Sequence, residues 1–257
     1  MNFTVENLEF YLLVLVRMSS FVMTAPFLSY ASLPVKVKLA ISFVLTLVVI
    51  QVIPIIQLDY VGVIGYSTLI VKEACVGAAI GFMANVCLYI VNFAGQLMDM
   101  EIGLSMVNLF DPQTHIQGTV SGAFYTYMVM LIMIVSNMHY YLIRAIVDSF
   151  RYFNVGEAVF SRSITDVMTD FMPNYMIIGF RIILPVFGCM LLINVVLGVL
   201  AKAAPQMNMF VIGLQLKVLI GILILAIMVE MIPTISDFIF GQMKEVISAM
   251  MKAFTPN

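Results

Sequence analysis

Residues 74–98 read ACVGAAIGFMANVCLYIVNFAGQLM, a stretch without a charged side chain. A bilayer core about 30 Å thick is crossed by roughly 20 helical residues, so the stretch is long enough for a membrane-spanning helix. It lacks the apolar–polar alternation that marks the strands of a membrane barrel. It therefore predicts a long apolar helix.

Similar apolar runs lie on both sides of this stretch, separated by charged residues. They are Phe10–Tyr30, Leu39–Leu58, Thr119–Ile143, Tyr175–Ala201 and Asn208–Ile235, with a half-helix at Gly62–Val71. The pattern predicts an all-α fold of about six long hydrophobic helices in one domain, residues 1–257, with a polar loop at 99–118 and a charged connector at 144–170. Because the basic residues give no clear orientation by the positive-inside rule, we expect an unusual topology with some helices paired as hairpins.

The composition is typical of a membrane protein or of a subunit buried in an apolar assembly. Of the 257 residues, 63% are hydrophobic and 10% are charged, whereas soluble domains carry about 25% charged residues. The 12 basic residues are outnumbered by 14 acidic ones, so the chain lacks the excess positive charge that binds nucleic acid. The high hydrophobicity excludes a disordered chain.

Patterns typical of catalysis and metal binding are missing from the sequence. It contains no HExxH, no GxSxG, no phosphate-binding loop and no dinucleotide-binding glycine pattern. His115 and His139 have no Cys or carboxylate neighbours at metal-ligand spacing, and the three cysteines form no CxxC pair. We therefore expect a protein that is not an enzyme and has no catalytic, cofactor or metal residues.

Four charged residues interrupt the apolar runs, namely Arg17, Arg181, Lys217 and Glu230. A lone cation at the centre of a membrane helix costs on the order of 3 kcal/mol on insertion scales, so each charge should face protein, water or another of the four. Two interpretations stay open. The charges form a polar conduit or ion relay, or they form structural ion pairs and helix-end cations that reach the membrane surface.

Small residues and the polar loop supply two further signals. Gly77 with Gly81, and Gly118 with Gly122, have the GxxxG spacing that lets helix backbones approach closely in lipid. The loop carries large apolar side chains just before Asp111-Pro112, a turn-forming pair. A solvated connector rarely carries such side chains, so the loop is a candidate for a functional contact; the alternative is a loop packed against its own protein.

Three blocks of residues, in order along the chain, resemble the FliR family of flagellar type III export-gate subunits. The first runs from Arg17-Met18-Ser19-Ser20-Phe21 through Ala25-Pro26-Phe27 to Pro34–Lys38, and the second contains Gly95-Gln96, Asp99, Gly103 and Asp111-Pro112. The third comprises Asn194, Gly198, Lys202, Pro205-Gln206, Asn208, Phe210, Gly213 and Lys217. At Lys202, many relatives carry arginine instead. Lysine keeps the positive charge but lacks the planar guanidinium that makes bidentate hydrogen bonds.

The resemblance implies a subunit of the bacterial inner membrane and the flagellar basal body. It implies a single copy assembled with FliP and FliQ subunits, with FlhB and FlhA as neighbours, membrane lipid around it and unfolded flagellar proteins as cargo. It also implies that the loop from about Leu104 to Gln117 projects into the conduit as a plug. The alternatives are the homologous subunit of a virulence injectisome, a secondary transporter or ion channel, and a structural membrane scaffold.

Two sets of candidate residues follow from these patterns and from the resemblance. The candidate plug comprises Leu104, Met106, Val107, Leu109, Phe110, Asp111 and Pro112, with Met106, Leu109 and Phe110 as the occluding side chains. The candidate structural or interface residues are Arg17, Pro26, Gly77, Gly81, Gly95, Gln96, Asp99, Gly103, Arg181, Asn194, Gly198, Lys202, Pro205, Asn208, Gly213 and Lys217.

Deletion of residues 106–110 tests the plug hypothesis. An apolar constriction excludes ions by dewetting, so its removal should raise ion leakage through the cell membrane while the assembly stays intact. Conductance across membranes that contain the variant complex measures the effect. An unchanged conductance would refute the plug.

Overall fold

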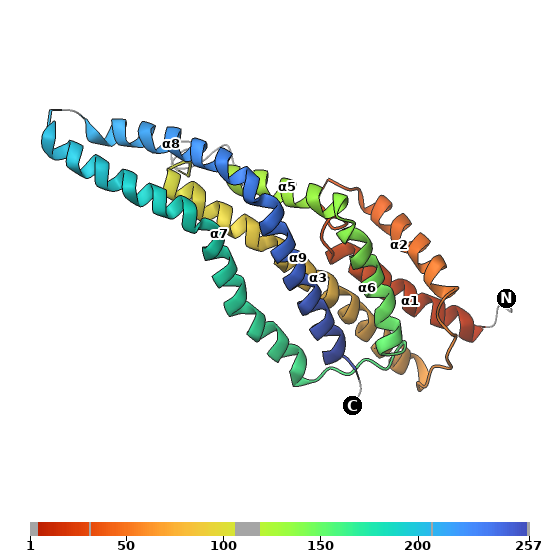
Figure 1. Cartoon of the computed structure of the whole chain (residues 1–257). Coiled ribbons are helices and arrows are strands. Elements are labelled where there is room, and N and C mark those ends of the chain that lie inside the picture. Colours follow the sequence, from red (N-terminus) through yellow and green to blue (C-terminus); the bar gives the residue numbers. More distant parts are fainter. Residues whose placement is uncertain (1–4, 31, 106–118, 207, 256–257) are drawn as a thin grey trace. The chain divides into compact units, whose positions relative to one another are not determined.

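The structure, a computed structural model, describes residues 5–30, 32–105, 119–206 and 208–255. Within these ranges it contains helices and no strand (Figure 1). The α-helices are α1 (Val5–Thr24), α2 (Val35–Ile50), α3 (Gly62–Ile102), α5 (Val120–Val135), α6 (Met138–Tyr152), α7 (Arg162–Ala203), α8 (Met209–Met228) and α9 (Ile232–Ala253). A 3₁₀ turn, η2 (Val229–Met231), follows α8. The all-α prediction is confirmed.

The chain divides into two compact units, and each is assembled from segments that are far apart in the sequence. The first unit contains Met1–Cys87, Ile134–Met172 and Phe240–Asn257. The second contains Leu88–Met133 and Pro173–Ile239. Four helices, α3, α5, α7 and α9, therefore contribute residues to both units. The single domain predicted from the sequence stays a prediction.

The core of the first unit contains a stripe of buried side chains on α1. Phe10, Leu13, Met18 and Phe21 are almost completely buried, and their spacing places them on one side of the helix. Burial of each large apolar side chain contributes about 1.5–3 kcal/mol. Arg17 lies within the same stripe and is equally buried, so a charge is part of this core.

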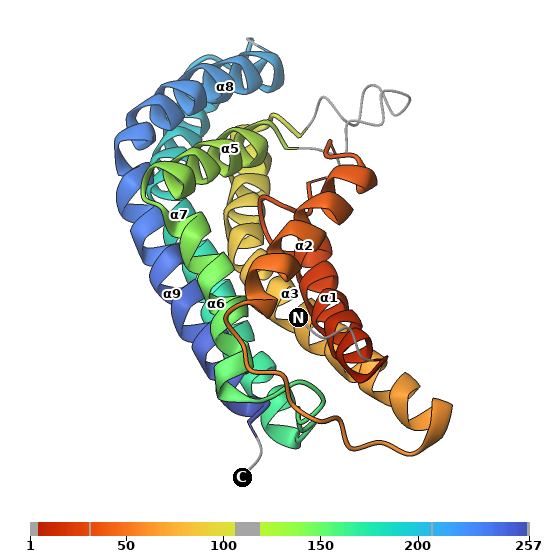
Figure 2. The same ribbon diagram turned by 90° about the vertical axis from the view of Figure 1, so that its right-hand side faces the viewer.

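Helix α2 packs along α1 (Figure 2) with its polar side inward. The buried residues of α2 are Lys38, Ser42, Thr46 and Val49. Its exposed face carries large apolar side chains, among them Leu39, Phe43, Val44, Leu47 and Val48. A contiguous apolar face of this kind is unfavourable in water and suits lipid or an apolar partner.

The second unit contains a hairpin of α8 and the part of α7 that follows Pro173, which lie side by side in Figures 1 and 2. At Gly213 of α8, an added Cβ atom would lie 3.3 Å from Leu197 Cδ1 of α7, so the absence of a side chain lets these helices approach. The outward side of the hairpin is apolar, with exposed side chains that include Phe180, Leu184, Leu192, Val195, Val199, Leu219, Ile222 and Leu223.

Four helical stretches in the described residues are long and apolar enough to cross a membrane, or five if α5 and α6 count as one span. The prediction of about six such helices was therefore approximate. Helices α3 and α7 have 41 and 42 residues, about twice the roughly 20 that cross a bilayer core. Helix α2, with 16 residues, is shorter than that. Helices and membrane crossings thus do not correspond one to one.

The structure places several boundaries differently from the sequence-based expectation. The half-helix at Gly62–Val71 is continuous with α3. The apolar run that begins at Thr119 is broken before α6, where Asn137 adopts a left-handed conformation with φ 58°. Residues 144–152 of the charged connector belong to α6, and residues 162–170 belong to α7, so only 153–161 form a connection.

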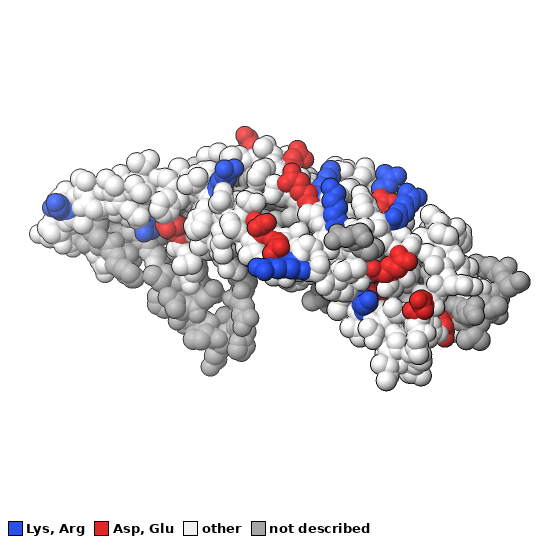
Figure 3. Space-filling view, turned by 90° about the horizontal axis from the view of Figure 1, so that it is seen from below, with Lys and Arg blue, Asp and Glu red and all other residues white. Residues whose placement is uncertain are grey.

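Exposed charges are compatible with a helix because water solvates them on its outer side. In the former connector, Arg151 pairs with Asp148 at 3.5 Å and Arg162 pairs with Asp166 at 3.9 Å, at i,i+3 and i,i+4 spacing. On the face shown in Figure 3, positive and negative side chains are few and interspersed. This mixture agrees with the unclear result of the positive-inside rule.

Candidate functional site

Most of the predicted plug lies outside the described residues. Leu104 follows the end of α3 and is half-buried. The other six, Met106, Val107, Leu109, Phe110, Asp111 and Pro112, fall between the described ranges, as does Gly118 of the second GxxxG pattern. The plug therefore stays a prediction.

A buried ion pair in the first unit joins α1 to α3. The Nε of Arg17 donates to Oε2 of Glu73, and Nη2 of Arg17 donates to Oε1 of Glu73 at 3.0 Å. Both side chains are completely buried. This two-point contact matches the planar guanidinium to the carboxylate, a match that a lysine ammonium does not offer. The structure thus supplies the partner that Arg17 was expected to need.

The remaining polar atoms of the pair are bonded to α6 and to the loop that follows it. Arg17 Nη1 donates to Ser149 Oγ at 3.2 Å, and the Gly156 N–H donates to Glu73 Oε1 at 2.7 Å. The guanidinium carbon lies 4.1 Å from the ring centre of Phe150 and 4.7 Å from that of Phe153, within the range of a cation–π contact. One ion pair therefore connects α1, α3, α6 and the loop after α6.

Sequence reasoning found Arg17 but missed Glu73, which it used only as a boundary between apolar runs. A signal for its position exists in the spacing. Glu73, Gly77, Ile80 and Ala84 recur at intervals of three and four residues, and all are buried. A carboxylate on the same helix face as two glycines faces the packed side of the helix, where it needs a cation.

Gly77 and Gly81 lie where α3 contacts α1. A Cβ atom at Gly77 would overlap Ser20 Oγ and the Arg17 carbonyl, and one at Gly81 would overlap Thr24 Oγ1. The two helices therefore approach more closely than any side chain would permit, one turn from the ion pair.

The turn between α1 and α2 is held by the side chains of Lys38 and Asn85, a role that the sequence analysis did not assign to them. Pro26 is buried, and Phe27 has a positive φ of 68°. Lys38 Nζ donates to the Ser29 carbonyl at 2.8 Å, and Asn85 Nδ2 of α3 donates to the Thr24 carbonyl at 3.1 Å. Lys38 of α2 thus binds a carbonyl of the turn, and Asn85 of α3 binds a carbonyl that the end of α1 leaves open.

In the second unit, α3 and α5 cross at Gly95, where a Cβ atom would overlap the backbone of Gly122. One turn further along α3, the buried carboxylate of Asp99 accepts from the Ser121 N–H, with both oxygens at 3.2 Å. A carboxylate at a helix N-terminus satisfies an open N–H and complements the helix dipole. Gly103, with φ 91°, ends α3, and Gln96 is exposed.

The residues of the third block are spread along α7, α8 and the turn between them. Most are exposed, namely Asn194, Gly198, Lys202, Pro205 and Asn208, and Lys217 is half-buried. Gly213 is buried, and a Cβ atom there would lie 3.3 Å from Leu197 Cδ1. Arg181 and Glu230 are also exposed, whereas Arg17 is bonded to Glu73. Because Arg17 is held in a buried ion pair, the structure does not support an ion relay that uses Arg17, Arg181 and Glu230.

Comparison with known proteins identifies the chain. Residues 8–243 match the family described as Bacterial export proteins, family 1. The chain belongs to this family.

Individual members of the export family are similar over nearly the whole chain. The flagellar biosynthetic protein FliR of Bacillus subtilis strain 168 is 30% identical over 248 residues, with 94% of each chain covered. The FliR proteins of Escherichia coli K12 and Aquifex aeolicus VF5 are 27% and 26% identical, covering 91% and 84% of this chain and 90% and 83% of their own length. The resemblance drawn from the three sequence blocks is confirmed, and the matched range includes the Arg17–Glu73 pair.

Removal of one member of the buried ion pair should destabilise this export-family protein strongly. Glu73→Gln leaves a buried cation unpaired, so we expect the free energy of unfolding to fall by about 3–5 kcal/mol. Replacement of both members, Arg17→Met with Glu73→Met, should recover much of that loss because no buried charge remains. Thermal unfolding of the protein purified in detergent measures both effects.

Arg151→Gln is the matched control for the ion-pair variants. It removes an exposed pair and should change the free energy of unfolding by less than about 1 kcal/mol. A double variant no more stable than Glu73→Gln would show that the unpaired charge is not the cause of the loss.

The α3–α5 crossing gives a separate prediction about backbone approach. Gly95→Ala forces the two backbones apart and should lower the free energy of unfolding by about 1–3 kcal/mol. Gly188→Ala serves as the control, since a Cβ atom there meets nothing within 4 Å, and Ala is favoured over Gly in a helix. Equal unfolding temperatures for the two variants would contradict the proposed close contact.

Proposed function

We propose that this chain is a membrane-embedded subunit of the flagellar type III protein export gate. The observation that carries the proposal is the match of the export family over residues 8–243, together with a FliR protein that is 30% identical over 94% of the chain. The outward apolar faces of α2 and of the α7–α8 hairpin support a position among lipid and other apolar subunits.

The proposed assembly contains FliP and FliQ subunits, with FlhA and FlhB nearby, in the bacterial inner membrane at the flagellar basal body. In it the chain helps to form the conduit through which unfolded flagellar proteins leave the cell, and it performs no bond chemistry itself. Two features support this role: the hydrogen-bonded polar groups in the interior and the exposed residues of the third block. Polar contacts fix the fold from within, and the outer surface is left for partners.

A flagellar role is favoured over a virulence injectisome by the relatives. The three most informative relatives, from Bacillus subtilis, Escherichia coli and Aquifex aeolicus, all carry the name flagellar biosynthetic protein FliR. A gene deletion separates the two roles if the secretion of both flagellar proteins and virulence proteins is measured.

Deletion of the gene should abolish secretion of hook and filament proteins and leave the cells without motility. The reason is that a conduit that lacks one of its subunits is incomplete and cannot carry the exported proteins. Immunoblots of culture supernatants measure secretion, and expression of the intact chain from a plasmid should restore it. Secretion of flagellar proteins at the parental level in the deletion strain would overturn the proposal.

A further inference from the structure

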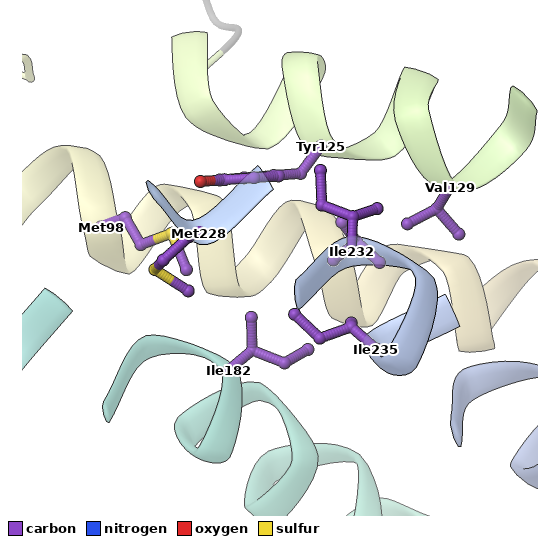
Figure 4. Close-up of a pocket in the computed structure, with 8 residues that line it drawn as sticks. Met98, Tyr125, Val129, Ile182, Met228, Ile232 and Ile235 are labelled. Carbon is purple, nitrogen blue, oxygen red and sulfur yellow. The ribbon is translucent and has the colours of Figure 1, made fainter. Parts of the chain in front are cut away.

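The second unit has an apolar groove between α7 and α9 with a volume of about 240 Å³. Its walls include Ile178, Arg181 and Pro185 of α7, Met231 of η2, and Thr234 and Phe238 of α9. The groove adjoins the core pocket of Figure 4, since Ile182, Met228 and Ile235 line both. Phe238 and Met231 are 45% and 46% exposed, so the groove is open on its outer side.

Arg181 places a positive charge in this apolar wall. Among the described residues, Arg17, Arg151 and Arg162 each pair with a carboxylate, whereas Arg144 and Arg181 form no ion pair. Of these two, Arg181 lines the groove. Glu230 and Asp237, which flank the groove residues in the sequence, are exposed and form no ion pair with it. Arg181 is exposed on this chain. In lipid or an apolar assembly an unpaired guanidinium is costly, so in such surroundings Arg181 needs an anionic partner that this chain does not supply.

Pro185 adds a polar group at the same place. Because proline has no N–H, the helix provides no i+4 donor for the carbonyl of Arg181. The lining residues thus include an arginine and Thr234 among otherwise apolar side chains, and the Arg181 carbonyl lacks its usual helical donor.

The apolar surface extends along α7 on both sides of Arg181. The ten residues before it and the 20 residues between it and Lys202 carry no charge, and exposed apolar side chains, such as Ile177 and Leu184, lie in both directions. An anionic lipid carries its charge at one end of its acyl chains. The groove instead calls for an occupant with apolar surface on both sides of its negative charge. An apolar helix with one acidic side chain has this form.

We propose that this groove binds an apolar helix of another polypeptide, with one Asp or Glu side chain paired to Arg181. The flexible, polarizable side chains of Met228 and Met231 adapt the floor and rim to that helix. The inference rests on the proposed function only in requiring an assembly that supplies the second polypeptide.

Photo-crosslinking in the native membrane tests the inference. A photoreactive phenylalanine derivative is placed at Phe238 in the groove, and at Leu192 on α7 as a control position outside its lining. Arg181→Glu, Arg181→Lys and the control Arg162→Glu, at an exposed position of the same helix, are then combined with the probe at Phe238. Immunoblots of the membrane fraction verify that each variant accumulates, and mass spectrometry identifies each adduct.

The expected adduct at Phe238 is a peptide from another protein with an acidic residue in an apolar segment. Arg181→Glu should reduce it at least tenfold, Arg181→Lys should retain much of it because the positive charge remains, and Arg162→Glu should leave it unchanged. Reversal of the acidic residue on the cross-linked peptide to Lys should restore the adduct with Arg181→Glu.

Three outcomes would overturn the inference: an adduct to phospholipid alone, no polypeptide adduct at Phe238, or a polypeptide adduct that Arg181→Glu leaves intact. The readout is the adduct and not secretion. A failed groove is therefore distinguishable from a failed export function, which the gene deletion tests by itself.

Discussion

The buried contact between Arg17 and Glu73 is the interaction on which the first unit depends. Burial of two charges costs several kcal/mol per ion, and their attraction offsets this only when the remaining donors and acceptors are also bonded. Here Ser149 and the Gly156 N–H complete the set, and two aromatic rings cover the guanidinium. Such a contact tolerates little displacement, so it fixes the positions of α1, α3 and α6 more narrowly than apolar packing alone.

The same logic explains why polar groups point inward in α2 and apolar ones point outward. In lipid or an apolar assembly, burial of apolar surface provides little force to hold helices together, because the surroundings are equally apolar. Close backbone approach and hydrogen bonds take over that role. Gly77, Gly81 and Gly95 provide the first, and Lys38, Asn85 and Asp99 provide the second. Water would disfavour this arrangement, and a membrane assembly stabilises it.

The sequence was sufficient for the helical class and for the glycine contacts at Gly77 and Gly81, because both depend on local spacing along the chain. Gly95 was named only through the family resemblance. The sequence was insufficient for the ion pair, since Arg17 and Glu73 are 56 residues apart and only the folded chain brings them together. It also misplaced the connector at 144–170. Charge there was taken as a helix boundary, but a helix continues through charges wherever one of its sides meets water, as at Arg151 and Arg162. Asn137, with its left-handed φ, breaks an apolar run that composition alone leaves continuous.

Two arginines in similar apolar stretches of sequence thus have opposite relations to the fold. Arg17 has its carboxylate, its hydroxyl and its aromatic cover within the chain, so its charge is fully used in folding. Arg181 is exposed in an apolar groove and has none of these partners among the described residues. Because an unpaired cation is costly in lipid or an apolar assembly, a chain that carries the second arginine has a reason outside its own fold. In a subunit of an assembly, that reason is a partner.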